Sequence, residues 1–350
     1  MNTTVVILIL GFLFGSILQY ANLNRYNVIS GMATLENLAV AKAISVAIGV
    51  GAVIIAIEIG LGFATYHIKP LLLGGIAIGG IIFGVGMAIL GYCPGTLPIS
   101  LGEGSIDALL GIIGGLVGGF VYTILLPSIQ SILGPDLGSI SLYTLVGQHH
   151  FIFYFLDIII GIAFVWIGFI LNKKEKSTNY KWLYAGIGLA ILNAVVFLTV
   201  GSNRIIGAST AYPFVADLIT GTTQNSYFPK IQGPGQWEVL FLTGAFVSGI
   251  VISLFRKEFK IKLMHSNWKK YKGNSVAKRI IWSFIGGFIL IIGARMAGGC
   301  TSGHILSGGM QLSLSSLIFA AFVFAGLLIT GKYFYKNNVK SSLLPSPSRL

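Results

Sequence analysis

The chain has 350 residues, of which 55% are hydrophobic and only 9% are charged. A soluble domain carries roughly 25% charged residues, so this composition excludes an ordinary water-soluble globule. The formal net charge of +13 would suit nucleic acid only if the charges formed a binding patch, and they lie mostly between apolar blocks. No nucleic-acid partner is therefore expected.

Nine apolar stretches are long enough to cross a bilayer, whose hydrocarbon core of about 30 Å needs about 20 helical residues. In chain order they cover residues 4–21, 39–60, 71–90, 104–126, 149–171, 181–200, 235–255, 279–297 and 313–332. The first stretch has no Lys or Arg before Arg25 and no evident cleavage site, so we expect a span and not a secretory signal. The sequence predicts an all-α polytopic membrane protein with about nine transmembrane helices, surrounded by membrane lipid.

Four further segments are too short and too rich in Gly, Pro, Ser and Thr to span the bilayer, yet too apolar for ordinary loops. They lie at about 22–35, 92–102, 203–220 and 299–309. Non-helical backbone at membrane depth is tolerated only where it is buried in protein or lines a cavity. We therefore expect four re-entrant or half-helix elements.

The sequence also contains an internal duplication. A shift of 207 residues superposes Cys93 on Cys300 together with several glycines, among them Gly86 on Gly293, and a weaker shift of 179 places Arg25 on Arg204. The two copies begin five spans apart, and an odd number of spans inverts the second copy. We expect a first repeat over 1–171 with five spans and an inverted repeat over 181–332 with four. Inverted repeats are a recurrent plan of secondary transporters, with the substrate site where broken helices meet.

The charge distribution predicts the orientation. Of the 23 Lys and Arg residues, 17 fall in segments 172–181, 256–279 and 332–350, which nine spans place on one side of the bilayer. Basic residues in short loops favour the cytoplasm, so we expect the amino terminus outside and a polar carboxy-terminal tail, 333–350, inside. The basic loop 256–279 could bind RNA or anionic lipid, but such a run is usually only a topology determinant.

The two cysteines, Cys93 in G-Y-C-P-G-T and Cys300 in G-G-C-T-S-G-H, each begin a broken segment. A membrane cysteine is often only a small packing residue, and two so far apart form neither a disulfide framework nor a zinc site. Their equivalent positions favour a role in a substrate pathway. A thiol is a weak, polarizable donor suited to sulfur-bearing solutes, and short helices starting there would point N–H groups at an anion.

The paired G-x-C-P-G and G-G-C-x-x-G-H segments, the R-x-x-G-A-S-T-x-Y-P run from Arg204 to Pro213 and the Gly-rich duplication resemble the YeeE/YedE family of sulfur-compound transporters. The resemblance covers about residues 5–332. It implies a bacterial inner-membrane protein that takes up thiosulfate, with Cys93 and Cys300 on a constricted central pathway of S–H···S hydrogen bonds. It also suggests that a TusA-like cytoplasmic sulfurtransferase consumes the solute, with the basic loop as a candidate docking surface.

The chain departs from the family in one place. The family commonly has a further cysteine shortly after the first helix, and Asn27 stands in the matching stretch. An amide can still donate to an anion but cannot form a disulfide or persulfide. The substrate is therefore open to another small sulfur or selenium species.

Several residues near the broken segments are candidates for the pathway: Arg25, Asn27, Gly91, Cys93, Gly95, Thr96, Arg204, Ser209, Thr210, Gly299, Cys300, Thr301, Gly303 and His304. Two interpretations of Arg25 and Arg204 are equally good: each attracts the anion, or each holds a re-entrant turn in place by hydrogen-bonding backbone carbonyls. Ionisable residues inside apolar blocks default to functional hypotheses; here these are Glu58, Asp107, Asp157 and Arg295. For the three carboxylates, pairing with a cation or snorkelling is favoured over proton coupling. For Arg295, the two interpretations given for Arg25 and Arg204 are again balanced. For His304, hydrogen bonding at a helix end is favoured over catalysis.

The leading hypothesis is a permease for a small sulfur-containing anion, most simply thiosulfate, and not an enzyme. A membrane thiol oxidoreductase or sulfurtransferase using the same cysteines is the alternative, but a reactive cysteine usually has a His, Lys, Arg or Cys neighbour, which G-Y-C-P-G-T lacks. No flavin, haem or metal signature is present, so no cofactor is expected. No phosphate-binding loop is present either, and a purely structural membrane partner would gain nothing from broken helices.

Overall fold

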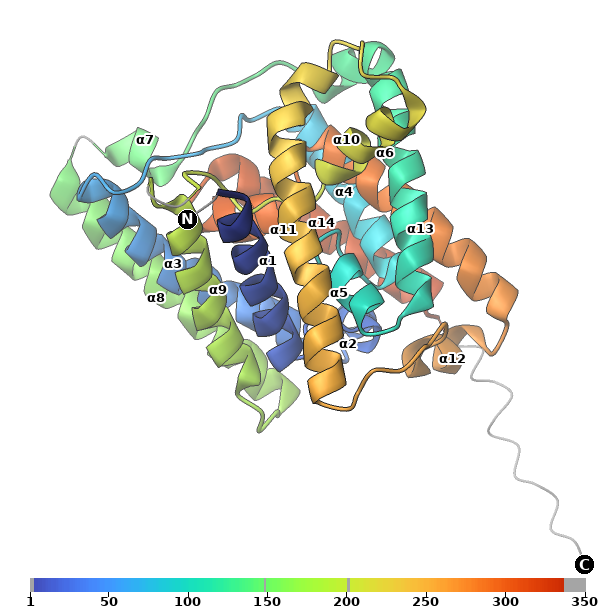
Figure 1. Cartoon of the computed structure of the whole chain (residues 1–350). Helices are drawn as coiled ribbons and strands as arrows, with labels where there is room; N and C mark the ends of the chain where they lie inside the picture. Colours follow the sequence, from blue (N-terminus) through green and yellow to red (C-terminus); the bar gives the residue numbers. More distant parts are fainter. Residues whose placement is uncertain (1–2, 148, 200–201, 337–350) are drawn as a thin grey trace, which may run out of the picture.

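The computed structural model describes residues 3–147, 149–199 and 202–336, and these residues form helices and no β-strands (Figure 1). In chain order the elements are α1 (Thr3–Tyr20), α2 (Tyr26–Ala33), α3 (Ala39–Gly60), α4 (Leu73–Leu90), α5 (Thr96–Gly102), α6 (Ile106–Leu133), α7 (Leu142–Val146), α8 (His150–Glu175), α9 (Lys181–Phe197), α10 (Ala211–Thr220), α11 (Phe228–Phe255), α12 (Ser266–Lys272), α13 (Val276–Met296), the π-helical segment η1 (Ser302–Gly308) and α14 (Leu314–Phe334). The predicted all-α class is confirmed.

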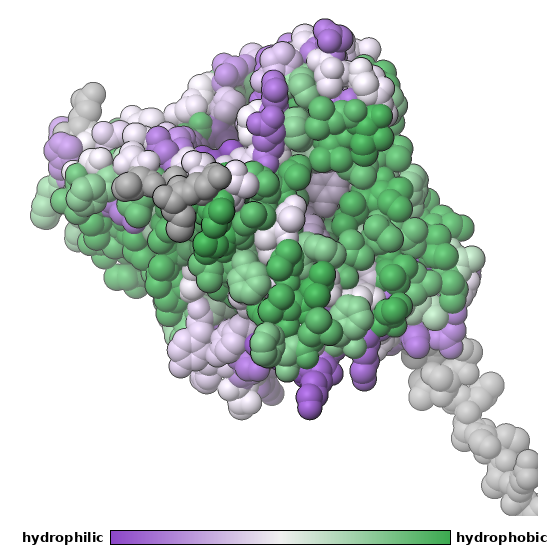
Figure 2. All heavy atoms as spheres, in the orientation of Figure 1, coloured by the Kyte–Doolittle hydropathy of each residue, from purple (hydrophilic) through white to green (hydrophobic). Residues whose placement is uncertain are grey.

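Eight of the described helices are long and apolar enough to cross a bilayer, namely α1, α3, α4, α6, α8, α11, α13 and α14. Helix α9 is also apolar but has only 17 residues. Each of the nine predicted spans therefore corresponds to a helix, one of them short. Figure 2 shows a wide apolar belt with hydrophilic residues gathered at the two ends of the helices. The chain is a multi-pass membrane protein.

Two helix ends differ clearly from the predicted ones, and each lies near a proline that the helix accommodates. Helix α11 begins at Phe228, not near 235, with Pro229 in its first turn and Pro234 inside it. A proline in the first turn costs little because its missing N–H would have no helical partner there. Helix α6 continues past Pro127 to Leu133, beyond the expected end at 126. Of the predicted tail, 333–350, the part from residue 337 onward lies outside the described residues.

Each of the four segments expected to break contains a short helix. Helices α2, α5 and α10 and the segment η1 lie within the predicted ranges 22–35, 92–102, 203–220 and 299–309. They are enclosed by spanning helices: α5 packs against α11 and α6, and η1 packs against α3 and α14. This enclosure buries backbone groups that a broken helix leaves without partners.

The spanning helices pack in matching pairs. Helix α4 packs against α14 as α13 packs against α6, and α1 packs against α11 as α9 packs against α3. Helices α4 and α13 also pack against each other. A Cβ on Gly86 of α4 would lie 2.5 Å from the Leu290 nitrogen, and a Cβ on Gly293 of α13 would lie 2.4 Å from the Phe83 nitrogen. The 207-residue shift relates these two contacts to each other, Gly86 to Gly293 and Phe83 to Leu290.

The contacts between α4 and α13 also give their relative direction. Near the start of α4, a Cβ on Gly75 would lie 2.5 Å from the carbonyl oxygen of Met296, the last residue of α13. At the other end, a Cβ on Gly286 of α13 would lie 2.9 Å from the nitrogen of Leu90, the last residue of α4. The two helices are antiparallel.

A buried ion pair joins the starts of α6 and α13. Arg279 Nη2 lies 2.5 Å from Asp107 Oδ2, and both side chains are fully buried. The same guanidinium donates to the Leu90 carbonyl at 2.9 Å, and His265 Nε2 lies 3.2 Å from the other Asp107 oxygen. Asp107 therefore pairs with a cation, one of the explanations that the sequence favoured over proton coupling.

Asp107→Ala should strongly destabilise the fold, because it leaves the Arg279 guanidinium buried without its partner, at a cost of about 3–5 kcal/mol. The thermal unfolding midpoint of the purified protein in detergent measures this loss. Glu36→Gln is the matched control, since Glu36 forms an exposed ion pair with Lys270 and such pairs contribute about 0–1 kcal/mol. Equal midpoints for the two variants would contradict the prediction.

Candidate functional site

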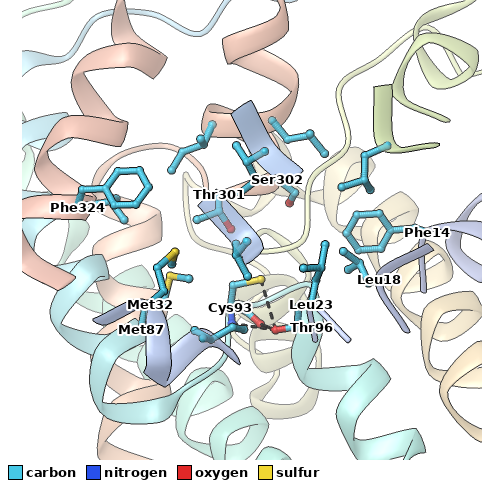
Figure 3. A pocket seen from close by; sticks show the side chains of 17 residues that line it. Phe14, Leu18, Leu23, Met32, Met87, Cys93, Thr96, Thr301, Ser302 and Phe324 are labelled. Carbon is cyan, nitrogen blue, oxygen red and sulfur yellow. Dashed lines mark hydrogen bonds between the residues drawn. The ribbon is translucent and has the colours of Figure 1, made fainter. Parts of the chain in front are cut away.

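The first cysteine lies between α4 and α5. Helix α4 is followed by Gly91, whose φ of 78° is left-handed, and a Cβ there would lie 2.2 Å from the Tyr26 ring. The chain can therefore turn at this point only with glycine. After the turn, the Cys93 N–H donates to Thr96 Oγ1 at 2.9 Å, and the same hydroxyl lies 3.4 Å from Cys93 Sγ (Figure 3). Thr96 thus holds the thiol at the start of α5.

The second cysteine occupies the corresponding turn between α13 and η1. Gly298, two residues before Cys300, has a left-handed φ of 73°. The Cys300 Sγ lies 3.1 Å from Ser302 Oγ. Each thiol therefore has a hydroxyl neighbour within its own broken segment.

A small central cavity of about 70 Å³ lies between the two broken segments. Figure 3 shows Cys93 and Thr96 on one side of it and Thr301 and Ser302 on the other, among apolar side chains such as Phe14. We call it the Cys93 cavity. No Lys, Arg, Asp or Glu of the described residues lines it. Its wall of sulfur, hydroxyl and hydrocarbon suits a small, polarizable solute.

A larger cavity of about 560 Å³, which we call the Cys300 cavity, is lined by Cys300, Gly299 and Gly303. It is strongly cationic. Its charged lining residues are Lys69, Arg204, Lys230, Arg295 and Glu238. Among the described residues, none of these four cations forms an ion pair with a carboxylate.

Arg295 is the most firmly placed of these cations. Its guanidinium donates to Tyr227 Oη at 2.9 Å, Ser209 Oγ at 3.2 Å and Thr210 Oγ1 at 3.0 Å. All of these acceptors are neutral hydroxyls. Glu238, the carboxylate of the cavity, instead accepts from the backbone N–H groups of Thr210 and Ala211, at 2.5 and 3.0 Å. The guanidinium charge is therefore left for an anion in the cavity.

Lys69 reaches the Cys300 segment from the connection between α3 and α4. Its ammonium donates to the Gly298 carbonyl, and a Cβ on Gly299 would lie 2.5 Å from Lys69 Nζ. Burial, reinforced by the neighbouring Arg295, lowers the pKa of Lys69 to about 8. Lys69 therefore carries its charge at neutral pH and loses it in mildly alkaline solution.

A third cavity, of about 270 Å³, lies at the opposite end of the helix bundle from the Cys300 cavity. It is lined by Arg25, Asn27 and part of the basic loop. We call it the Arg25 cavity. Arg25 pairs with Glu258, and its Nε lies 3.9 Å from Glu103. Asn27 Oδ1 accepts from the Asn267 backbone N–H at 3.1 Å, in the first turn of α12. Asn27 thus holds α12 in place.

Eleven of the fourteen candidate pathway residues line one of these cavities. Cys93, Thr96 and Thr301 line the Cys93 cavity, Arg204, Ser209, Thr210, Gly299, Cys300 and Gly303 line the Cys300 cavity, and Arg25 and Asn27 line the Arg25 cavity. Gly91 and Gly95 do not line them. Nor does His304, which is buried with Nε2 2.8 Å from the Ala297 carbonyl and Nδ1 3.1 Å from Ser316 Oγ. These contacts match the helix-end hydrogen bonding favoured from the sequence.

The sequence interpretation did not include Lys69, Lys230, Tyr227 and Glu238. A signal for the two lysines was present: both lie at the end of the bundle where the sequence predicts few basic residues. A basic residue on that side is an exception to the charge rule, and such an exception indicates a candidate functional residue. Glu58 and Asp157, the remaining carboxylates of the apolar blocks, line none of the three cavities.

Comparison with known proteins gives two matches. A family model described as Sulphur transport matches residues 23–329. The thiosulfate transporter TsuA of Spirochaeta thermophila is 26% identical over 332 residues, which span 91% of this chain and 95% of that protein. Because the family match covers most of the chain and confirms the resemblance seen in the cysteine motifs, this chain belongs to the Sulphur transport (YeeE/YedE) family of transporters.

Proposed function

We propose that this protein is a permease, not an enzyme, that carries a small sulfur-containing anion, most simply thiosulfate, across the bacterial inner membrane. The observation that carries the proposal is the row of three cavities, in which Cys93 lines the central cavity and Cys300 lines the wide cavity beside it. The similarity to a thiosulfate transporter supports the same substrate. Asn27 leaves a related sulfur or selenium anion as the second choice.

The route runs from the Cys300 cavity to the Arg25 cavity. Cys300 lines the first cavity, and its hydroxyl neighbour Ser302 lines the Cys93 cavity. On the far side, helix α5 extends from Thr96 in the Cys93 cavity to Ser100 in the Arg25 cavity. Successive cavities are therefore lined by residues of the same broken segment, which brings each cavity close to the next.

The chemistry of this route fits an anion with one soft end. In the Cys300 cavity, Arg295 and Lys69 supply positive charge without carboxylate partners, which favours oxyanion groups. In the Cys93 cavity, the S–H and O–H donors can hydrogen-bond a terminal sulfur, while the apolar wall excludes water. Sulfate has the charge but no sulfur terminus for the thiols.

We propose further that residues 1–171 and 181–332 are inverted repeats. The antiparallel contact of α4 with α13 and its matched glycine positions support this. The basic segments at the α8–α9 connection, the 256–279 loop and the end of α14 would then face the cytoplasm, with the amino terminus outside. The Cys300 cavity would open outside, and a TusA-like sulfurtransferase would dock at the basic loop.

A sulfurtransferase acting through Cys300 is the second candidate. Lys69 and Arg295 share the cavity of Cys300, and cations of this kind stabilise a thiolate, a feature that the sequence motif did not reveal. In that reaction the thiolate attacks the outer sulfur of thiosulfate, the S–S bond breaks, and sulfite leaves with the electron pair. The product is a Cys300 persulfide.

Uptake of labelled thiosulfate into proteoliposomes should fall by about tenfold in both Cys93→Ala and Cys300→Ala, since each loses about one hydrogen bond to the passing anion. Excess sulfate should not inhibit the native protein. Ile162→Ala, on the exposed face of α8, is the control and should keep native uptake. Full uptake by both cysteine variants would contradict a pathway through the two thiols.

The apparent KM for thiosulfate should rise as pH increases from 7 to 9, because Lys69, with a pKa of about 8, is protonated below that pH and neutral above it. Lys69→Met should raise KM at pH 7 by about tenfold, the value of one charged hydrogen bond, and should flatten the pH profile. Lys230→Gln, at an exposed position on the same cavity, should keep the native profile. An unchanged profile in Lys69→Met would show that another group titrates.

The mass of the intact protein after incubation with thiosulfate separates the two candidate functions. We expect an unchanged mass, because a permease forms no covalent intermediate. A gain of one sulfur atom, absent in Cys300→Ala, would favour the sulfurtransferase instead.

A further inference from the structure

An apolar groove of about 290 Å³ runs between α6 and α11. Ile112 and Leu116 of α6 form one wall and Leu242 and Phe246 of α11 the other, with α5 and α10 as the floor. The two hydroxyl groups in this lining are already hydrogen-bonded within the protein. Thr243 Oγ1 donates to a carbonyl of its own helix at 2.8 Å, and Tyr212 Oη donates to the Pro94 carbonyl at 3.2 Å.

A second groove, of about 300 Å³, occupies the corresponding place between α3 and α14, with α2 and η1 as its floor. This second groove is covered. Phe164, Ile167 and Leu171 of α8 line it, because α8 packs along α3. Among the described residues, no helix takes the place of α8 over the α6–α11 groove (Figure 1).

We propose that the α6–α11 groove binds an acyl chain of a bilayer lipid. The groove lies within the apolar belt (Figure 2), between exposed hydrophobic residues such as Ile113 of α6 and Val247 of α11. Its wall offers mainly hydrocarbon surface, and the two hydroxyl groups in it already donate their protons to backbone carbonyls. The face of α8 that covers the corresponding groove is already packed against its own α3, so this face of a second copy is not available to fill the α6–α11 groove.

The bound chain would touch the pathway through Tyr212. The ring of Tyr212 lines the groove, while its hydroxyl holds the carbonyl of Pro94, the residue after Cys93. An acyl chain packed on this ring would restrict its motion and so steady the turn that carries the thiol. This role does not depend on which anion is transported.

The test uses the full chain in liposomes that contain phosphatidylcholine with a photoreactive diazirine in its acyl chain. After irradiation, digestion and mass spectrometry, we expect adducts at 112–116, 211–215 and 239–246. Thr243→Phe fills the groove from α11 and should reduce these adducts several-fold. Leu116→Phe fills it from α6 and serves if the first variant does not fold.

Two internal references make the result decisive. The first reference is the exposed face of α8 within residues 155–162, which should react with bulk lipid equally in native and groove-filled proteins. The second is the covered groove at residues 305–309, which should not be labelled. Groove adducts that persist in a filled variant, or that are no more abundant than those on α8, would overturn the proposal. Covalent dimers joined through this groove would overturn it in favour of a second copy. Because labelling requires no transport, its failure is distinct from failure of the proposed function.

Discussion

The arrangement depends on one constraint, that a helix broken inside a bilayer must have its free backbone groups covered by protein. Spanning helices come close enough to provide this cover only where they lack side chains. A Cβ on Gly249 of α11 would lie 2.4 Å from the Ile99 carbonyl of α5. The glycine content of the spans is therefore a condition for placing Cys93 and Cys300 at membrane depth.

Arg25 and Arg204, which the 179-residue shift relates, have different surroundings at the two ends of the row of cavities. Arg25 is paired with Glu258, whereas Arg204 packs over the Trp237 ring, 4.5 Å from its centroid, without a carboxylate partner. The Cys300 end thus keeps free positive charge, and the Arg25 end has part of its charge neutralised. In the proposed route and orientation, an anion is attracted more strongly at the first end than at the second, which suits uptake in that direction.

The sequence predicted the spans and broken segments well because both have local signals, apolar length for the first and clustered Gly, Pro, Ser and Thr for the second. The start of α11 was misplaced because Pro229 and Pro234 look like a loop locally, whereas tertiary packing supports a helix there. Lys69 was missed for a different reason. Its partner segment around Gly298 is far away in sequence, and only folding brings the ammonium beside Cys300.

The described lining of the Cys93 cavity has no charged residue, and this suits an anion that passes through better than one that stays bound. A lysine at this narrow point would form charge-assisted hydrogen bonds, roughly twice as strong as neutral ones, in a site with little water to compete. The anion would bind there and leave slowly. Thiol and hydroxyl donors hold it only weakly, at about 1 kcal/mol for each hydrogen bond. In the proposed route, free cations in the wide Cys300 cavity therefore select the anion, while the uncharged constriction lets it pass.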